Sequence, residues 1–560
     1  MFPRFSIHAD RVVPILDQLR PKLSLLRTQN ILILVDGGIA LSSTAGDFGI
    51  GKIAAIVDGA DFGFARTRVV LATRDGPQAK AALSEAQRLQ QATYTGFRFD
   101  QTEAGGGRSI DLFDQIWCFG IRPLIHNPTL QDDAQITAAG NNPTSDTEAA
   151  VLRTWMDQRM GGLLAMGDHA ILGASMCSNI PRVRRMRRWK AAESVPHRTG
   201  SSRHDTNRPA SAAQTWHPVS NPSPAIIPNG VERDANPQPL EWVPESSFVR
   251  GLRVFKRPHP ILCHPQHGPI DVFPDHPHEG WCYDTDEITD PQGDFPQTGA
   301  NPPMPRAIAH VRSLPDPPWN LDKGDQPGRK FAAITIYDGQ RINLGRVVVD
   351  STWHHWFDMN LAGLEAENGV EWAKVRRYFV NVAIWLAKPG WRSRMLEPAI
   401  AALPFSYAYL QELDARMPTV ELGRSFAEYL YPLLGPCQVS EWLFDLVFEV
   451  PRLADFWRFR WPRPDPCLSC PPWPLVEDYL LGHIARAALR RADRVHQQLA
   501  RSGKIEVGDL DPDGVLDEAR RALFEGMGEL AADWQRSLDY SQGLLKELAG
   551  FAKAPLKSAD

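Results

Sequence analysis

The chain has 560 residues, which is more than one hydrophobic core usually serves, so we expect two domains. Hydrophobic residues make up 43% of the sequence, enough to fill both cores. The 61 Lys and Arg residues nearly balance the 66 Asp and Glu residues, and the net charge of -5 gives no general electrostatic reason to bind nucleic acid or anionic lipid. We therefore do not expect nucleic acid as a partner.

The sequence predicts neither a secretory signal nor a membrane span. The start of the chain lacks an apolar core behind a basic cap, and the longest apolar runs, such as residues 378–387, are too short to cross a bilayer. The seven cysteines are few and odd in number, which argues against a disulfide framework and for a reducing compartment. We expect a cytoplasmic protein without membrane association.

Short apolar segments alternate with helical segments over residues 29–168, as is typical of a doubly wound parallel sheet. The predicted strands lie in residues 30–38, 67–75, 113–121 and 161–168, and the predicted helices in residues 76–90 and 147–158. In such sheets ligands bind beyond the carboxyl ends of the strands. Asp36, Gly37 and Gly38, which follow the first strand, are therefore predicted ligand-binding residues.

Two stretches interrupt this alternation and are predicted to be long loops. Residues 196–245 are rich in Ser, Asn, Pro and Thr, and residues 284–328 in Asp, Pro and Gly. Strand-like segments then return, at residues 251–257, 330–339 and 345–356. We therefore expect an α/β domain over residues 1–357 with a loop-rich insertion at about 190–250.

Beyond residue 360 the sequence becomes helical. Residues 370–389 and 473–502 carry apolar residues at helical spacing, and prolines lie between such segments. This pattern predicts a separate all-α domain over residues 358–560, whose apolar residues form its core.

Residues 161–169, GGLLAMGDH, are the most informative segment because they end in Gly167, Asp168 and His169. In amidotransferase-like folds a nucleophile stands two residues after a glycine, at a sharp turn from strand to helix. His169 holds that position here. The chain thus resembles the class I glutamine amidotransferase-like superfamily, and within it the trehalose-utilisation (ThuA-like) branch, whose members carry Gly-x-His in place of Gly-x-Cys.

Further motifs extend this resemblance over residues 29–357, apart from the insertion. ThuA-like proteins close their domain with a Gly-Arg-Val strand followed by a histidine, and the matching residues are Gly345, Arg346, Val347 and His354. Their His-Pro step and acidic cluster are matched by His264, Pro265, His278 and Glu279, with His259 and Pro260 as an equal alternative for the step. The resemblance implies a flavodoxin-like doubly wound sheet.

The side chains at these positions suggest acid and base chemistry. A neutral imidazole at the turn can be a general base or proton shuttle, and a histidine from the last strand can share the work, so His169 and His354 are the predicted pair. Asp168 is predicted to orient His169 or to accept a proton, and Glu279 is a second acid or base. Alternatively, the histidines only satisfy buried backbone groups. Further ligand contacts are predicted at His264, His278 and Arg346.

Residues 259–279 contain five histidines and three carboxylates, in number enough for zinc or manganese. They lack a fixed spacing such as His-Glu-x-x-His, so no cofactor is predicted and a divalent metal is a secondary hypothesis. Its candidate ligands are His264, His276, His278 and Glu279. The basic residues 182–190 are predicted to form a surface helix whose side-chain stems pack over acidic loops. The alternatives are that they hold a phosphate or carboxylate near the pocket, or contact nucleic acid through an exposed face with Trp189.

Three functions follow from these residues. Without a cysteine at the turn, glutamine hydrolysis through a thioester is excluded. The leading hypothesis, carried by the resemblance, is an enzyme that acts on a sugar or polyol by His-mediated acid/base chemistry. The second is a degenerate, non-catalytic domain that binds a small molecule, coupled to a helical domain that docks a protein partner. The third is a metal-dependent hydrolase.

Overall fold

The structure is a computed structural model that describes most of the α/β part of the chain and several later helices. The described residues are 28–42, 48–60, 66–122, 143–168, 172–189, 237–250, 253–274, 280–298, 302–313, 329–389, 391, 417–449, 473–502 and parts of 517–546.

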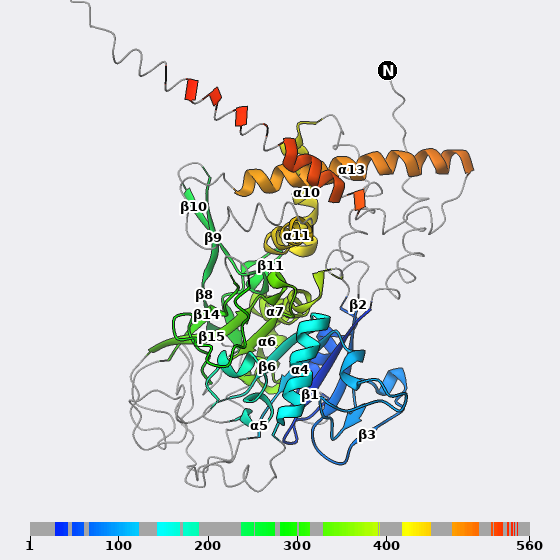
Figure 1. The fold of residues 1–560 in the computed structure, drawn as a ribbon, viewed down its shortest axis with the longest axis vertical. Helices are drawn as coiled ribbons and strands as arrows, with labels where there is room; N and C mark the ends of the chain where they lie inside the picture. Colours follow the sequence, from blue (N-terminus) through cyan, green and yellow to red (C-terminus); the bar gives the residue numbers. More distant parts are fainter. Residues whose placement is uncertain are drawn as a thin grey trace, which may run out of the picture.

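A ten-stranded sheet forms the centre of the molecule (Figure 1). Its spatial order is β3-β4-β2-β1-β5-β6-β16-β15-β14-β8. The strands are β1 (Thr28–Val35), β2 (Arg66–Thr73), β3 (Ala79–Lys80), β4 (Tyr94–Thr95), β5 (Gln115–Phe119), β6 (Gly162–Met166), β8 (Glu241–Trp242), β14 (Arg306–Ser313), β15 (Arg329–Tyr337) and β16 (Val347–Asp350). Both outermost strands, β3 and β8, have two residues.

The central strands are parallel and the strands on one side are antiparallel. β2, β1, β5, β6 and β16 pair in parallel, so their carboxyl ends meet at one edge, which we call the carboxyl edge; the opposite one is the amino edge. β15, β14 and β8 continue the sheet beyond β16 in antiparallel pairing. β5 and β6 are buried at every position, as expected for strands covered on both faces.

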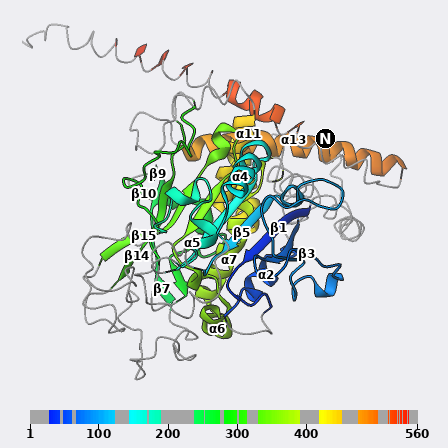
Figure 2. The ribbon, with the colours of Figure 1, turned by 60° about the horizontal axis from the view of Figure 1, so that its bottom comes forward.

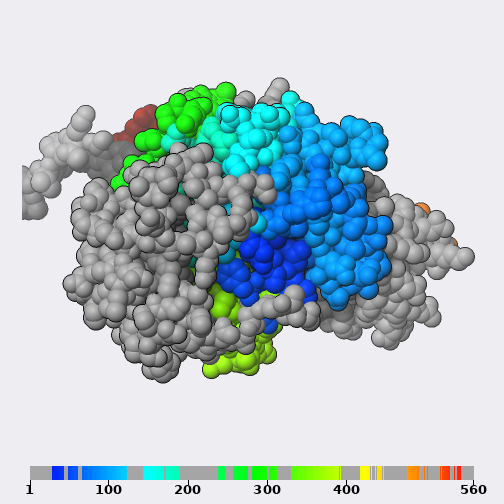
Figure 3. All heavy atoms as spheres, turned by 90° about the horizontal axis from the view of Figure 1, so that it is seen from below, coloured from blue at the N-terminus to red at the C-terminus, as the bar shows by residue number. Residues whose placement is uncertain are grey.

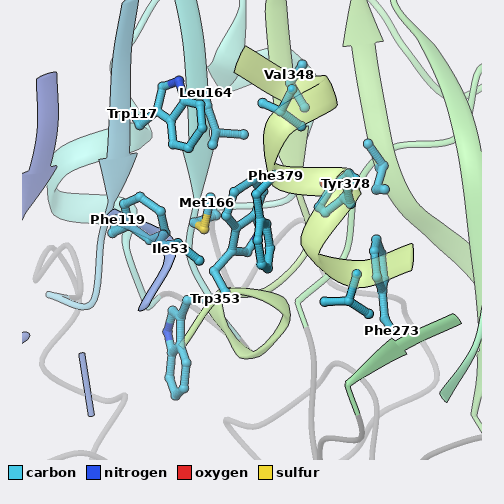
Figure 4. Packing of buried hydrophobic residues seen from close by; sticks show 14 of the residues in the cluster. Ile53, Trp117, Phe119, Leu164, Met166, Phe273, Val348, Trp353, Tyr378 and Phe379 are labelled. Atoms are coloured by element: carbon cyan, nitrogen blue, oxygen red, sulfur yellow. The ribbon is translucent and has the colours of Figure 1, made fainter. Parts of the chain in front are cut away.

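Helices cover both faces of this sheet. One face shares a core with α2 (Gly51–Val57), α6 (Asp358–Glu367) and α7 (Val370–Leu386), and the other with α4 (Asp146–Arg159) and α5 (Ala174–Cys177). Figure 4 shows the first face, where Tyr378 and Phe379 of α7 lie against Trp117 of β5, Leu164 of β6 and Val348 of β16. Side chains alternate between the two faces of the sheet along each strand, so the sheet contributes to two separate apolar layers.

The helices after residue 357 fall into two groups. α6 and α7 pack in the same core as the sheet. α10 (Thr419–Leu434), α11 (Pro436–Glu449) and α13 (Trp473–Ser502) pack together at the end of the molecule opposite α6 (Figure 2). Glycines let two of them approach closely, since a Cβ at Gly423 would lie 1.6 Å from the carbonyl oxygen of Asp478. The division into two domains at residue 357 stays a prediction.

Three small two-stranded sheets flank the main sheet. They pair β9 (Pro244–Arg250) with β10 (Arg253–Pro258), β11 (Cys263–His264) with β12 (Gly268–Pro269), and β7 (Pro237–Pro239) with β13 (Val272–Pro274). The predicted insertion at about 190–250 lies outside the described residues as far as residue 236. Among the helices that the structure describes, none is both long and apolar enough to cross a membrane.

The structure confirms an α/β architecture and most predicted elements, with corrections at residues 76–90, 182–190 and 284–328. The predicted helix over residues 76–90 is wrong, because that segment holds β3 and a short 3-10 turn at Glu85–Gln87. Its residues are nearly all exposed, so a helix there would have no apolar face to bury. The predicted loop over residues 284–328 contains β14, which buries Ala307, Ala309 and Val311 in the sheet.

Candidate functional site

The carboxyl edge collects the carboxylates that follow the parallel strands. Asp36 follows β1, Asp168 comes shortly after β6, and Asp350 ends β16; all three are buried. Figure 3 views the molecule from the side of this edge, where residues around the first strands (blue) reach the surface. Parallel strands bring these residues together because their carboxyl ends share one edge.

A tight turn follows β6 at Gly167. A Cβ at Gly167 would lie 2.2 Å from the carbonyl oxygen of Leu172, and one at Gly120, after β5, would lie 2.8 Å from Cα of Gly173. Gly173 has a φ of +87°, in the region that favours glycine. His169 lies outside the described residues. The helix after the turn, α5, has only four residues, so its dipole adds little positive potential there.

Asp168 and His354 lie side by side at this edge. Asp168 Oδ2 is 3.7 Å from His354 Nε2, and both side chains are completely buried. Thr352 connects them, since its hydroxyl donates to Asp168 Oδ1 at 2.8 Å and accepts from the backbone N–H of His354 at 3.1 Å. Of the four predicted catalytic residues the structure brings these two together. His169 and Glu279 are outside the described residues.

Asn360 sets the orientation of the His354 ring. Nδ1 of His354 lies 3.3 Å from the side-chain oxygen of Asn360, in the first turn of α6. Because that oxygen only accepts, Nδ1 carries the proton of the neutral ring. Nε2 then carries the lone pair of the neutral ring, and this nitrogen faces Asp168. This arrangement allows His354 to take up a proton at Nε2, next to a carboxylate that stabilises the resulting cation.

Arg187 joins the ends of β6 and β16. Its guanidinium donates to the backbone oxygens of Asp168 and Ser351, with Nε 3.0 Å from Ser351 O, and it lies over the ring of Trp189 at 4.4 Å. The side chain is fully buried and forms no ion pair with any residue that the structure describes. A Cβ at Gly280 would lie 1.8 Å from Nη2, so glycine leaves the space for this group. A buried positive charge therefore stands beside the Asp168 and His354 pair.

Asp350 anchors the short turn, Trp353–His355, that carries His354. Its carboxylate lies 2.7 Å from His355 Nδ1 and accepts hydrogen bonds from Trp356 Nε1 and from the Tyr378 hydroxyl, both at 2.8 Å. Burial and this neighbouring carboxylate raise the pKa of Tyr378 well above its usual value, which keeps the hydroxyl a donor. The network fixes the turn to α7 and thereby holds His354 at the edge.

Asp36 occupies the place where the strand order reverses, with β2 on one side of β1 and β5 on the other. Its Oδ1 accepts the backbone N–H groups of Ile121 at 2.6 Å and Arg122 at 3.1 Å. Its Oδ2 is buried and accepts no hydrogen bond from any described residue. Burial raises the pKa of this carboxyl from 3.8 to about 6, although the two backbone donors and Arg74 lower it.

The glycines after Asp36 form an open turn. Gly37 and Gly38 have φ values of +70° and +84°. A Cβ at Gly37 would lie 2.0 Å from Ile121 Cγ2, so the chain needs glycine to pass this loop. The N–H of Gly38 donates to Asp75 Oδ2 at 3.2 Å, and the other oxygen of Asp75 accepts from Arg122 at 2.8 Å. The predicted ligand-binding residues Asp36 to Gly38 thus lie together at the carboxyl edge.

Arg346 lies at the amino edge, at the other end of β16 from His354. Its Nε donates to Asp338 at 2.7 Å, its Nη1 to the carbonyl oxygen of Trp385 at 3.0 Å, and its Nη2 to Glu441 of α11. The structure therefore does not bring this predicted ligand-binding residue to the carboxyl edge. Arg346 instead joins α11 to the sheet.

His264 lies in β11, which packs against α7 and α11. Its Nδ1 accepts the backbone N–H groups of Gln266 and His267, both at 3.0 Å, so the neutral ring carries its proton on Nε2 and offers no lone pair there to a metal. Burial, followed by His267, lowers its pKa to about 4. The other predicted metal ligands, His276, His278 and Glu279, lie outside the described residues. Within the described part of the chain no group of three or more metal-ligating side chains occurs.

The basic segment at residues 182–190 does not form the predicted surface helix. It contains a 3-10 turn, Val183–Arg185, and two of its arginines, Arg184 and Arg188, face an acidic loop. Arg184 donates to both oxygens of Asp294, at 2.7 and 2.9 Å, and Arg188 pairs with Glu287 at 2.8 Å. These tertiary ion pairs determine the local conformation, because they place the cationic groups against the loop rather than in solvent.

The sequence patterns did not single out Arg187, Thr352 or Asn360. Thr352 gave a usable signal, because it is a polar residue just after a buried strand. Arg187 belongs to the basic run at residues 182–190, for which an anion site was an alternative prediction, but nothing distinguished it from the other basic residues. Asn360 lies in a helix whose packing is not visible in the sequence.

Comparisons with known proteins leave the family of this chain open. No family model matches it, and neither the curated proteins nor the solved structures give a significant match. The geometry of the carboxyl edge therefore carries the functional argument.

Proposed function

We propose that the carboxyl edge is the active site of an enzyme that transfers protons on a small hydroxylated molecule. The observation that carries this proposal is the buried pair of Asp168 and His354, with 3.7 Å between Oδ2 and Nε2. A carboxylate and an imidazole held this close can serve as acid and base on one substrate. His169, which directly follows Asp168 in the chain, is the third member of the proposed set.

Each neighbour of the pair has a role in this chemistry. His354 takes a proton from the substrate at Nε2, while Asn360 keeps the other ring nitrogen protonated. Thr352 holds Asp168 beside it. The buried guanidinium of Arg187 stabilises negative charge that develops on the substrate, because a fixed positive charge acts strongly in a site without water.

The order of the five longer parallel strands supports a flavodoxin-like fold for the α/β part; the two-residue β4 lies beyond them and also pairs in parallel with β2, at one residue. In chain order the five central parallel strands are β1, β2, β5, β6 and β16, and in space they lie as second, first, third, fourth and fifth. That order is typical of flavodoxin-like doubly wound sheets. The resemblance to ThuA-like proteins fits the same order and is the only basis for expecting a sugar or polyol as substrate. We further propose that α10, α11 and α13 belong to an all-α domain, whereas α6 and α7 share the core of the sheet.

A non-catalytic scaffold is the second candidate. The complete burial of Asp168 and His354 favours the scaffold, because a buried pair of this kind has another possible role, which is to hold two strand ends together. In that case the edge would bind a small ligand without turnover, and α10, α11 and α13 would dock a protein partner.

A reducing compartment, such as the cytoplasm, is part of the proposal. It is supported by the described cysteines, which are buried and form no disulfide with one another: Cys118, Cys177, Cys263 and Cys282.

Deuterium exchange tests the proposed chemistry. The protein is incubated in D2O with a panel of aldoses, ketoses and aldonic acids, and deuterium at carbon is followed by NMR. We expect exchange with at least one compound. In His354→Gln the exchange rate should fall by a factor of about 100 or more, because general base catalysis contributes at least that factor.

His310→Gln is the matched control, since His310 also pairs with a carboxylate, Asp284 at 2.8 Å, but in β14. This variant should exchange deuterium at the wild-type rate. If wild type exchanges none of the compounds, the enzyme proposal fails and the scaffold is the better account.

A further inference from the structure

Asp36 has a buried carboxylate oxygen that the fold leaves without a donor. The residue is 1% exposed, and its two oxygens differ sharply, since Oδ1 accepts two backbone N–H groups while Oδ2 accepts none from the described residues. Leaving an ionisable oxygen unmatched in the interior is costly, and buried polar atoms in proteins are nearly always hydrogen-bonded. The unmatched oxygen therefore requires an explanation other than stability.

The position of Asp36 suggests that explanation. In open α/β sheets ligands bind where the strand order reverses, outside the carboxyl ends of the strands, and Asp36 follows the strand at which this reversal occurs. The turn beside it is open, because Gly38 is exposed and a Cβ built on it would meet nothing within 4 Å. A ligand at the edge would find space next to this turn.

One loop connects Asp36 to the proposed catalytic pair. The N–H of Ile121 binds Asp36, and the preceding residue, Gly120, packs directly on Gly173. Gly173 in turn closes the turn that starts at Gly167 and contains Asp168. Asp36 and Asp168 are therefore parts of one continuous edge.

We propose that Oδ2 of Asp36 accepts a hydrogen bond from a hydroxyl group of the substrate, so that the turn from Asp36 to Gly38 forms a binding subsite beside Asp168 and His354. This inference rests on the proposed function and adds to it a residue that recognises the substrate rather than one that reacts with it.

The charges around Asp36 favour a neutral hydroxyl over an ion. Arg74 and Arg122 both lie near, each already paired, Arg74 with Glu148 at 2.9 Å and Arg122 with Asp75 at 2.8 Å. These guanidinium groups would repel an ammonium ligand, and the carboxylates of Asp36 and Asp75 would repel an anion. A polyhydroxylated compound satisfies the free oxygen without either penalty.

The acceptor role requires the ionised carboxylate. Burial raises the pKa of Asp36 to about 6, so the carboxyl gains its proton, and loses the free acceptor, as the pH falls below that value. The titratable and charged groups near Asp36 are Arg74 and Asp75 after β2, Arg122 after β5, Cys118 in β5 and Cys177 in α5; of their side chains, Arg74 lowers the pKa of Asp36 and Asp75 raises it. Binding of a hydroxylated ligand should therefore weaken at mildly acidic pH.

Equilibrium binding of glucose, fructose, sorbitol and myo-inositol tests the inference, by calorimetry on wild type and Asp36→Asn. The variant keeps an oxygen for the N–H groups of Ile121 and Arg122 but replaces the free acceptor with an amide donor. We expect binding of at least one probe by wild type, weakened about 10- to 100-fold in Asp36→Asn, as for a lost hydrogen bond to a charged group. A melting curve shows whether the variant is folded.

Two further variants separate this inference from the proposed function. Asp114→Asn removes a carboxylate of the same kind at the amino edge, where it accepts from Asn30 N at 3.1 Å, and should bind as wild type does. His310→Gln, in β14, should also retain binding. Loss of affinity only in Asp36→Asn supports the subsite even if no deuterium exchange occurs. Unchanged affinity in Asp36→Asn, or no binding of any probe by wild type, overturns it.

Discussion

Two buried arginines, one at each edge of the sheet, are held in different ways. Arg346 at the amino edge has carboxylate partners in Asp338 and Glu441, so its charge is neutralised within the fold. Arg187 at the carboxyl edge is bound by backbone oxygens and by the face of Trp189. The charge of Arg346 is thus matched, as in a structural region. Arg187 differs from it, and from Arg74 at its own edge, which pairs with Glu148, because no described carboxylate forms an ion pair with it; such charges often occur at functional sites.

Removing Arg346 should have the largest effect on stability. Arg346→Met removes the buried cation between Asp338 and Glu441, although Asp338 keeps its ion pair with Arg341 at 3.0 Å; breaking a buried ion pair typically costs about 3 to 5 kcal/mol. We expect a loss of that size in the free energy of unfolding, measured by urea denaturation. Lys388→Met is the control, because the Lys388 and Asp114 pair, 3.1 Å apart and about one third exposed, should contribute less than about 1 kcal/mol. Equal losses of unfolding free energy in both variants would contradict the structural role of the Arg346 ion pairs.

Asp36→Asn should stabilise the protein at neutral pH. The pKa of Asp36 is about 6 in the folded protein against 3.8 for an unperturbed Asp, so the folded state binds more protons between these values and stability falls as the pH rises through them. At about 1.4 kcal/mol per pKa unit this amounts to roughly 3 kcal/mol near pH 7.

The variant should therefore gain up to that amount at neutral pH, and little or nothing near pH 4, in urea denaturation at both values. Part of the pH dependence should remain, because Asp358, whose pKa burial also raises to about 6, is unchanged. A destabilised variant at neutral pH would show that Oδ2 is needed by the fold itself.

Arg187→Met should have the smallest effect of the three. The substitution leaves the backbone oxygens of Asp168 and Ser351 without a donor, but it strands no carboxylate and removes a buried charge. We expect a loss of about 1 to 2 kcal/mol, clearly less than for Arg346→Met, in the same denaturation experiment. A loss as large as that of Arg346→Met would remove the difference between the two arginines.

Much of the sheet could be predicted from the sequence because its strands are short, apolar and buried on both faces. β1, β5 and β6 are such strands, and each was predicted within a few residues of its bounds. β14 was missed because polar and proline-rich sequence surrounds it and because its pairing with β15 is a tertiary contact. The false helix at residues 76–90 had helical composition but no apolar face to bury.

The sequence predicted the site residues that come directly after a strand, but not those whose role depends on packing. Asp36, Asp168 and His354 could be found because each comes just after a strand of the sheet. The role of Arg187 depends on the space left by Gly280, far away in the chain, and nothing in the sequence indicates that contact. Arg346 shows the reverse case, since a motif residue was placed by the fold at the amino edge.

The shape of the sheet also affects how the protein tolerates high concentration. Its interior strands are among the most apolar segments of the chain, and such strands promote aggregation when a long free edge can pair with another copy. Here the outermost strands, β3 and β8, have two residues each. The outermost strands themselves therefore present few N–H and C=O groups to another copy, although by strand pairing the short strands β4 and β8 cover only Ala72 of β2 and Ala309 and His310 of β14.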